Sequence, residues 1–104
     1  MIRPPHPGET IKEDYLAPLG MSVNQLAKAL GIGASRMNEI VRGERGVTAD
    51  TALRLGHWFG TSAEYWLNLQ KLYELRLAQR EVGDQLTKLP KLSDRKRRSV
   101  RALG

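Results

Sequence analysis

The chain has 104 residues, of which 40% are hydrophobic and 27% are charged, a composition that fits one small globular domain. It has no cysteine and two isolated histidines, which excludes disulfides and thiol nucleophiles and leaves no ligand set for a metal or cofactor. No stretch approaches the ~20 apolar residues that span a bilayer, and the N-terminus lacks the apolar region of a signal peptide. We therefore expect a cytoplasmic protein with no membrane partner.

The net charge of +6 is unevenly distributed along the chain. Residues 88–104 carry seven basic side chains and one acidic one, whereas residues 1–87 carry ten of each. The excess charge is thus weak evidence that the body of the protein binds nucleic acid, and that case must come from a motif. We expect a folded domain over residues 1–82, with its last helix at about 62–82, and a basic, flexible tail over 83–104.

Proline and glycine divide the chain into helical pieces, and no strand-like alternation of useful length occurs. The helices are expected at about residues 7–16, 22–30, 33–43, 48–60 and 63–80. Pro18 and Gly20 should end the first, and Thr48 should cap the fourth, whose inner stripe includes Leu53. Gly83 should interrupt the chain after the fifth. The sequence therefore predicts an all-α fold.

The second and third helices have the spacing of a helix-turn-helix motif. Leu26 and Leu30 form the inner side of the second helix, and the small Ala27 allows close crossing by the third. Gly31 can take the left-handed conformation needed at the helix exit. In the third helix, Met37 and Ile40 lie on the side facing the core.

The opposite side of the third helix carries polar groups able to reach the edges of bases in the major groove. Arginine suits guanine, asparagine suits adenine and glutamate suits cytosine. A solvated face of an ordinary amphipathic helix would show the same periodicity, and it is the joint helix-turn-helix spacing that favours DNA binding. The candidate DNA-binding residues are Ser35, Arg36, Asn38, Glu39 and Arg42, with Arg45 placed for a backbone contact.

Several motifs over residues 6–78 together resemble the HigA-type antitoxins, which are xenobiotic-response-element-like helix-turn-helix proteins. They are His6-Pro7-Gly8-Glu9, Leu16-x-Pro18-Leu19-Gly20, Asn38-Glu39-Ile40-Val41, Thr48-Ala49-Asp50-Thr51-Ala52-Leu53-Arg54-Leu55 and Phe59-Gly60-Thr61-Ser62-x-Glu64-x-Trp66-Leu67-Asn68-Leu69-Gln70. The resemblance implies a lambda-repressor-like bundle of about five helices that binds operator DNA in its own promoter as a homodimer. It also implies a protein partner, a RelE-like messenger-RNA endonuclease toxin of the HigB type. The chain departs from the family at Val23, where glutamine is common, and at Gly33-Ala34, where a proline-containing start is more usual.

The fifth helix is apolar on nearly every side and therefore needs more than one packing partner. Trp66, Leu69 and Tyr73 lie within about 60° of one another on the helix and are the candidate dimerisation residues. Leu67, Leu75 and Ala78 cover the other side, so one set should pack on the domain and the other across a two-fold axis. A fully buried central helix in a monomer is the alternative.

Other functions compete with an antitoxin that represses its own operon. One alternative is a stand-alone helix-turn-helix regulator without a toxin, and another is an interaction module that has lost operator binding. An enzyme is disfavoured, because the carboxylates Glu9, Glu13 and Asp14 have no evident nucleophile or metal partner and suit a solvated acidic face. We assign no catalytic, metal or cofactor-binding residue.

Overall fold

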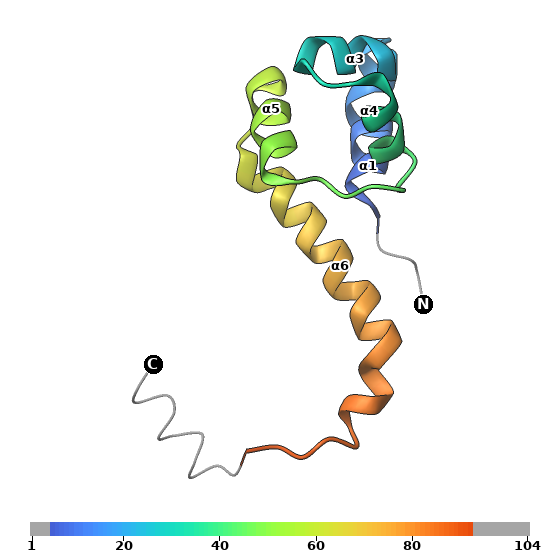
Figure 1. The fold of residues 1–104 in the computed structure, drawn as a ribbon, viewed down its shortest axis with the longest axis vertical. Coiled ribbons are helices and arrows are strands. Elements are labelled where there is room, and N and C mark those ends of the chain that lie inside the picture. Colours follow the sequence, from blue (N-terminus) through green and yellow to red (C-terminus); the bar gives the residue numbers. More distant parts are fainter. Residues whose placement is uncertain (1–4, 93–104) are drawn as a thin grey trace, which may run out of the picture.

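The computed structural model describes residues 5–92, and this part of the chain contains helices and turns but no strand. The helical elements are α1 (Pro7–Thr10), η1 (Ile11–Leu16), α2 (Ala17–Leu19), α3 (Val23–Leu30), α4 (Ala34–Val41), α5 (Ala49–Phe59) and α6 (Ala63–Leu86). The first three run on without a break and form one helical segment, so the described chain has five in all. In Figure 1, α6 extends away from the body formed by the others. The expected all-α bundle of about five helices is confirmed.

The first helical segment is closed at both ends by local hydrogen bonds. His6 caps it: its Nδ1 accepts from the backbone N–H of Gly8 at 2.9 Å, and its own N–H donates to Glu9 Oε2 at 3.2 Å. The middle part, η1, is a π-helix. The segment continues through Pro18, which lies in the first turn of α2, and ends at Gly20 with φ +63°. It is therefore three residues longer than predicted.

The core lies where α5 and α6 meet the first segment and the two short helices. Trp66 of α6 is fully buried, with its ring centroid 5.3 Å from that of Tyr15 and 5.9 Å from that of Phe59. Its indole Nε1 donates to Thr61 Oγ1 at 2.7 Å, so the one polar atom of this large side chain is satisfied. The other buried apolar residues are Ile11, Leu16, Leu26, Ala27, Leu30, Met37, Ile40, Val47, Ala52 and Leu55.

Two details of the predicted helices are wrong. Leu53 is 64% exposed, because α5 buries the side that carries Thr51, Ala52, Leu55 and Gly56. Gly83 does not interrupt the last helix, which runs through it to Leu86. One glycine costs an α-helix only about 1 kcal/mol relative to alanine, and the helix-forming residues on both sides offset that cost.

Among residues 5–92, no helix is both long and apolar enough to cross a membrane. Most of the expected basic tail, residues 93–104, lies outside the described residues, so its flexibility stays a prediction.

Candidate nucleic-acid interface

The helix-turn-helix motif is built from α3 and α4 and the short turn between them. Ser22 caps α3 with a reciprocal pair of bonds: its hydroxyl accepts from the Gln25 N–H at 3.1 Å, and its own N–H donates to Gln25 Oε1 at 2.8 Å. Gly31 ends α3 with φ +71°, which allows the Ile32 N–H to donate back to Ala27 O at 3.0 Å. These local bonds fix where α4 starts relative to α3.

Helix α4 presents one polar side, as predicted from its periodicity. Met37 and Ile40 are fully buried on the inner side. The outer side carries Ser35, which is exposed, and Asn38 and Glu39, which are half-buried. Arg42 and Arg45, just beyond the end of α4, are exposed. Contact of these residues with DNA stays a prediction, since the structure contains the protein alone.

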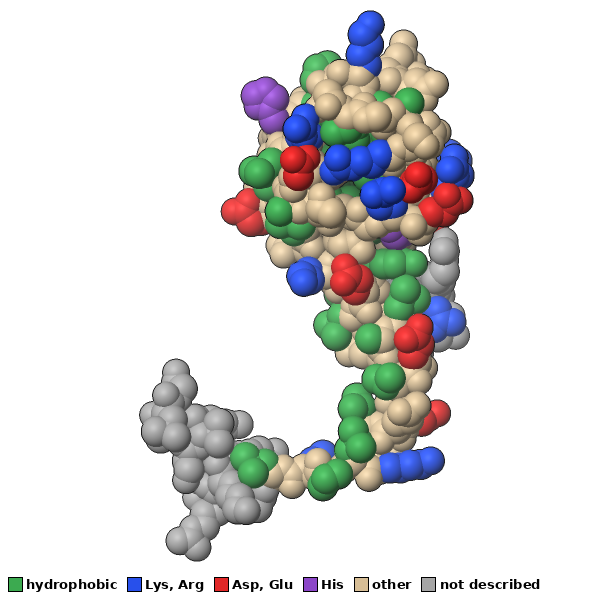
Figure 2. Space-filling model, viewed as in Figure 1, with side chains coloured by type: hydrophobic (Ala, Val, Ile, Leu, Met, Phe, Trp, Pro, Cys, Tyr) green, Lys and Arg blue, Asp and Glu red, His purple; other side chains and the backbone are tan. Residues whose placement is uncertain are grey.

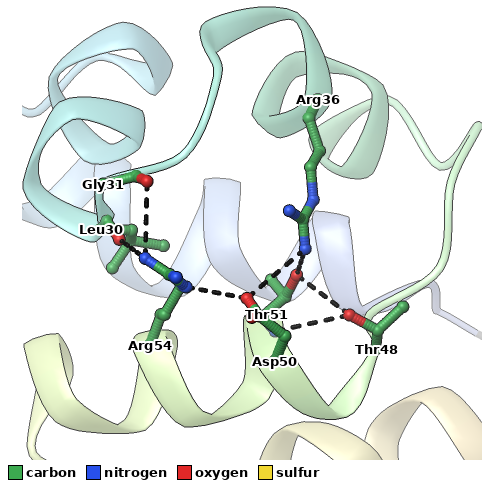
Figure 3. A network of polar contacts seen from close by, with 7 residues as sticks. All are labelled: Leu30, Gly31, Arg36, Thr48, Asp50, Thr51 and Arg54. Carbon is green, nitrogen blue, oxygen red and sulfur yellow. Dashed lines mark hydrogen bonds and ion pairs between the residues drawn. The ribbon is translucent and has the colours of Figure 1, made fainter.

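The placement of Arg36 differs from the expectation. Figure 3 shows its side chain extending from α4 toward α5, where Nη2 donates to Thr51 Oγ1 at 2.6 Å and lies 3.7 Å from Asp50 Oδ1. Thr51 is itself fully buried, and its hydroxyl lies 3.3 Å from that of Thr48, the cap of α5. The guanidinium of Arg36 thus fastens α4 to α5 and does not lie among the outward groups, because its position on the helix faces the neighbouring element.

A second arginine, Arg54 of α5, holds the end of α3, and sequence reasoning missed it. Its Nη1 donates to the carbonyl oxygens of Leu30 at 2.8 Å and Gly31 at 3.4 Å, and its Nε donates to Asp50 Oδ1 at 2.7 Å (Figure 3). Carbonyls at a helix C-terminus lack intrahelical partners, and a cation there also complements the helix dipole. Both helices of the motif are therefore tied to α5.

The two exposed arginines after α4 are paired with carboxylates. Arg42 contacts Glu44 through Nε at 3.1 Å and Nη2 at 3.2 Å, and Arg45 Nε donates to Glu39 Oε2 at 3.0 Å. The hydrogen bonds from Arg42 lower the pKa of Glu44 and raise that of Arg42. A phosphate that binds either arginine must therefore compete with a carboxylate for it. Glu39, expected to read a base, already has a partner in Arg45.

A hydrogen bond joins the outward faces of the two motif helices. Asn38 Nδ2 of α4 donates to Asn24 Oδ1 of α3 at 3.0 Å and to the backbone oxygen of Ala34 at 2.8 Å. Sequence reasoning missed Asn24. The signal in the sequence was that Asn24 is a polar residue in the first turn of α3. It follows directly after Val23, and position 23 is the one at which the family commonly has a bracing glutamine.

The end of α4 packs against α1, and the segment that follows it is held by α6. Gly8 lies so close to the end of α4 that a Cβ there would be 2.1 Å from the carbonyl oxygen of Ile40. Gln70 of α6 is buried, and its Oε1 accepts from the Val47 N–H at 2.8 Å. The position of the polar side of α4 thus depends on Gly8 near the start of the domain and on Gln70 in its last helix.

Comparison with known proteins places this arrangement in a family. The helix-turn-helix family model matches residues 11–66. The chain is 55% identical over 76 residues to virulence-associated protein I of Dichelobacter nodosus, covering 73% of this chain and 70% of that protein. It is 35% identical over 74 residues to antitoxin HigA-1 of Vibrio cholerae, covering 70% and 69%. The solved structure of Pseudomonas aeruginosa antitoxin HigA with higBA promoter is similar at a TM-score of 0.82 and 43% identity, covering 86% and 97% of the two chains.

The chain belongs to the HigA family of helix-turn-helix proteins. This confirms the resemblance drawn from the motifs at residues 6–78. No group of three or more His, Cys, Asp or Glu side chains within residues 5–92 could hold a metal ion.

In this HigA-family chain, the candidate dimerisation residues lie on the side of α6 that faces the chain's own domain. Trp66 is fully buried in the core, Leu69 packs against it, and Tyr73 meets His6 edge-on at 4.8 Å between ring centroids. All three contact their own domain, and Trp66 has no surface left for a partner, whereas Leu69 and Tyr73 are half-buried. An all-round apolar helix does not reveal from sequence which side faces inward.

A neighbouring side of α6 carries its exposed apolar side chains. Tyr65, Leu72, Leu75, Val82 and Leu86 are each between 38% and 52% exposed. Their spacing of seven, three, seven and four residues keeps them on one stripe of the helix, as in a coiled-coil seam. Figure 2 shows hydrophobic side chains continuing along α6 where it leaves the body.

Proposed function

We propose that this protein is the DNA-binding antitoxin of a type II toxin-antitoxin system, a homodimer that represses its own operon and neutralises a RelE/HigB-like messenger-RNA endonuclease. The observation that carries the proposal is the outward polar face of α4, formed by Ser35, Asn38, Glu39 and Arg42 on a motif tied to α5 by Arg36 and Arg54. Such a rigid face suits base recognition in a major groove, because contacts with base edges require fixed geometry.

Operator DNA as the partner is supported by geometry and by the relatives. The N-terminus of α3, capped by Ser22, lies beside α4 and offers backbone N–H groups to a phosphate. The similar Pseudomonas aeruginosa HigA was solved with higBA promoter DNA, and antitoxin GraA, 41% identical to this chain, was solved with its operator.

The dimer is supported by the exposed stripe on α6. Burying a leucine side chain stabilises an association by roughly 1.5–3 kcal/mol before the cost of ordering, so a seam of five large apolar residues is substantial. A two-fold axis beside α6 would present two copies of α4 to successive turns of DNA, about 34 Å apart.

The toxin partner rests on the relatives' names as antitoxins. In this proposal the chain has no catalytic role of its own: it acts in the cytoplasm by occupying DNA and by covering the toxin. A gene for a small basic protein adjacent to this one is the candidate toxin, and co-expression should relieve its toxicity.

The test of DNA binding begins with a duplex selected from a random library by the full-length protein. Asn38→Ala and Arg42→Ala should each weaken binding to it by about 1–3 kcal/mol with little effect on a shuffled duplex, while helical content is unchanged. Arg80→Ala, an exposed arginine on α6, is the control for charge alone. Equal losses on selected and shuffled duplexes would refute base reading by α4.

A further inference from the structure

The side-chain amide of Asn38 has one orientation that satisfies its surroundings. The atom 2.8 Å from the backbone oxygen of Ala34 must be the nitrogen, because a carbonyl oxygen accepts hydrogen bonds and cannot donate them. The same nitrogen lies 3.0 Å from Asn24 Oδ1. An amide nitrogen has two N–H bonds, and both are thus used within the protein. The polar atom that remains for a ligand is Oδ1.

This arrangement changes what Asn38 can read. The usual pairing of asparagine with adenine needs one donor, for N7, and one acceptor, for the N6 amino group. Asn38 offers only the acceptor. In the major groove, adenine and cytosine present amino donors, whereas guanine and thymine present carbonyl acceptors that would repel Oδ1.

We propose that Asn38 reads an exocyclic amino group, of adenine or cytosine, through Oδ1 alone, and that Asn24 is the positioning residue that imposes this choice. The inference rests on the proposed DNA-binding function. It gives Asn24 the bracing role that valine at position 23 cannot perform, because a valine side chain has no hydrogen-bonding group. It also replaces the simple expectation that Asn38 pairs with adenine through two bonds.

The role of Asn24 predicts a change in specificity when it is removed. In Asn24→Ala the Asn38 nitrogen loses one acceptor, so one N–H becomes available for N7 of a purine. The preference at the contacted position should then shift from either amino base toward adenine. Asn24→Asp keeps an acceptor for Asn38, so it should keep the base preference of the wild type while its negative charge weakens binding to all duplexes.

The experiment uses the full-length protein and the duplex that it selects from a random library. The contacted position is the one whose preference disappears in Asn38→Ala. Replacing adenine there by purine, or cytosine by 2-pyrimidinone, removes the amino group and should weaken wild-type binding about three- to tenfold, the range of one net hydrogen bond. Replacing adenine by 7-deazaadenine removes N7 and should leave wild-type binding unchanged, yet weaken binding by Asn24→Ala.

Lys28→Ala provides a matched control, since Lys28 is an exposed residue of α3 with no hydrogen bond to α4 among the described contacts. It should lower affinity for all duplexes without altering base preference. Three results would each overturn the inference. The wild type could bind the 7-deazaadenine duplex more weakly, it could select guanine or thymine at the contacted position, or Asn24→Ala could keep the base preference of the wild type. A wild-type protein that selects no sequence at all would instead overturn the proposed function on which it rests.

Discussion

Gly8 is the position at which one added methyl group should have the largest effect on the recognition surface. Its hypothetical Cβ would lie 2.1 Å from the oxygen of Ile40 and 2.8 Å from that of Val41, both on the backbone at the end of α4. Ordinary contacts of a carbon with an oxygen exceed 3 Å, so Gly8→Ala requires α1 and α4 to separate by about 1 Å. No side-chain rotation can relieve the overlap.

The expected cost of Gly8→Ala follows from two opposing terms. Overpacking of a core costs typically 1–3 kcal/mol, and a clash between two backbones belongs at the upper end of that range or beyond. Alanine gains about 0.5–1 kcal/mol over glycine in a helix. We therefore expect a net loss of about 2–3 kcal/mol in the free energy of unfolding, and a melting temperature lowered by roughly 10–20 °C.

The assay is urea unfolding followed by circular dichroism, at one fixed protein concentration because dimerisation contributes to apparent stability. Gly83→Ala is the matched control: a Cβ there meets nothing within 4 Å, and the substitution should stabilise α6 by about 1 kcal/mol. If Gly8→Ala unfolds at the wild-type urea midpoint, the close approach of α1 to α4 is refuted.

Three further changes to the chain test the apolar stripe on α6, the pair of Arg42 with Glu44, and the basic segment at residues 88–104. Leu72→Lys combined with Leu75→Lys should give a monomer at tens of micromolar in sedimentation equilibrium. Leu53→Lys changes a leucine of α5 that is even more exposed, and it should leave a dimer. Glu44→Gln should release Arg42 to contact a phosphate, which should strengthen binding to selected and shuffled duplexes alike. The salt dependence of binding should become steeper by about one phosphate contact. The control Glu81→Gln should show neither effect. Deleting residues 88–104 should leave the salt slope of operator binding unchanged, because the end of α6 lies away from α4 (Figure 1). A salt slope that falls by two or more on deletion would show that the basic segment contacts DNA.

The parts of the fold that depend on local chemistry could be predicted from the sequence. Ser22, Thr48 and Ser62 cap helices, and Gly31 and Gly60 end them in the left-handed conformation, because each signal acts within a few residues of the chain. The buried side of α4 likewise follows from its periodicity. The helix-turn-helix motif needs little more than these local rules.

The side-chain partners within the site could not be predicted, because they join residues far apart in the sequence. Arg36 bonds a residue 15 positions away, and Arg54 bonds one 24 positions away. Periodicity gives the direction of a side chain from its own helix but does not say what lies opposite. The same limit explains the error at Trp66: a helix apolar on all sides needs the tertiary structure to show which side is inward.

In the proposed complex, a dimer places two copies of α4 in the major groove on one side of the DNA. The most direct measurement is fluorescence anisotropy of a duplex with two selected half-sites, compared with duplexes in which five base pairs are added between them. Half a helical turn moves the second half-site to the other side of the DNA, so binding should weaken at least tenfold, and ten added base pairs should restore part of it. Equal affinity for all three spacings would show that the two copies of α4 do not bind one side of the DNA as a single dimer.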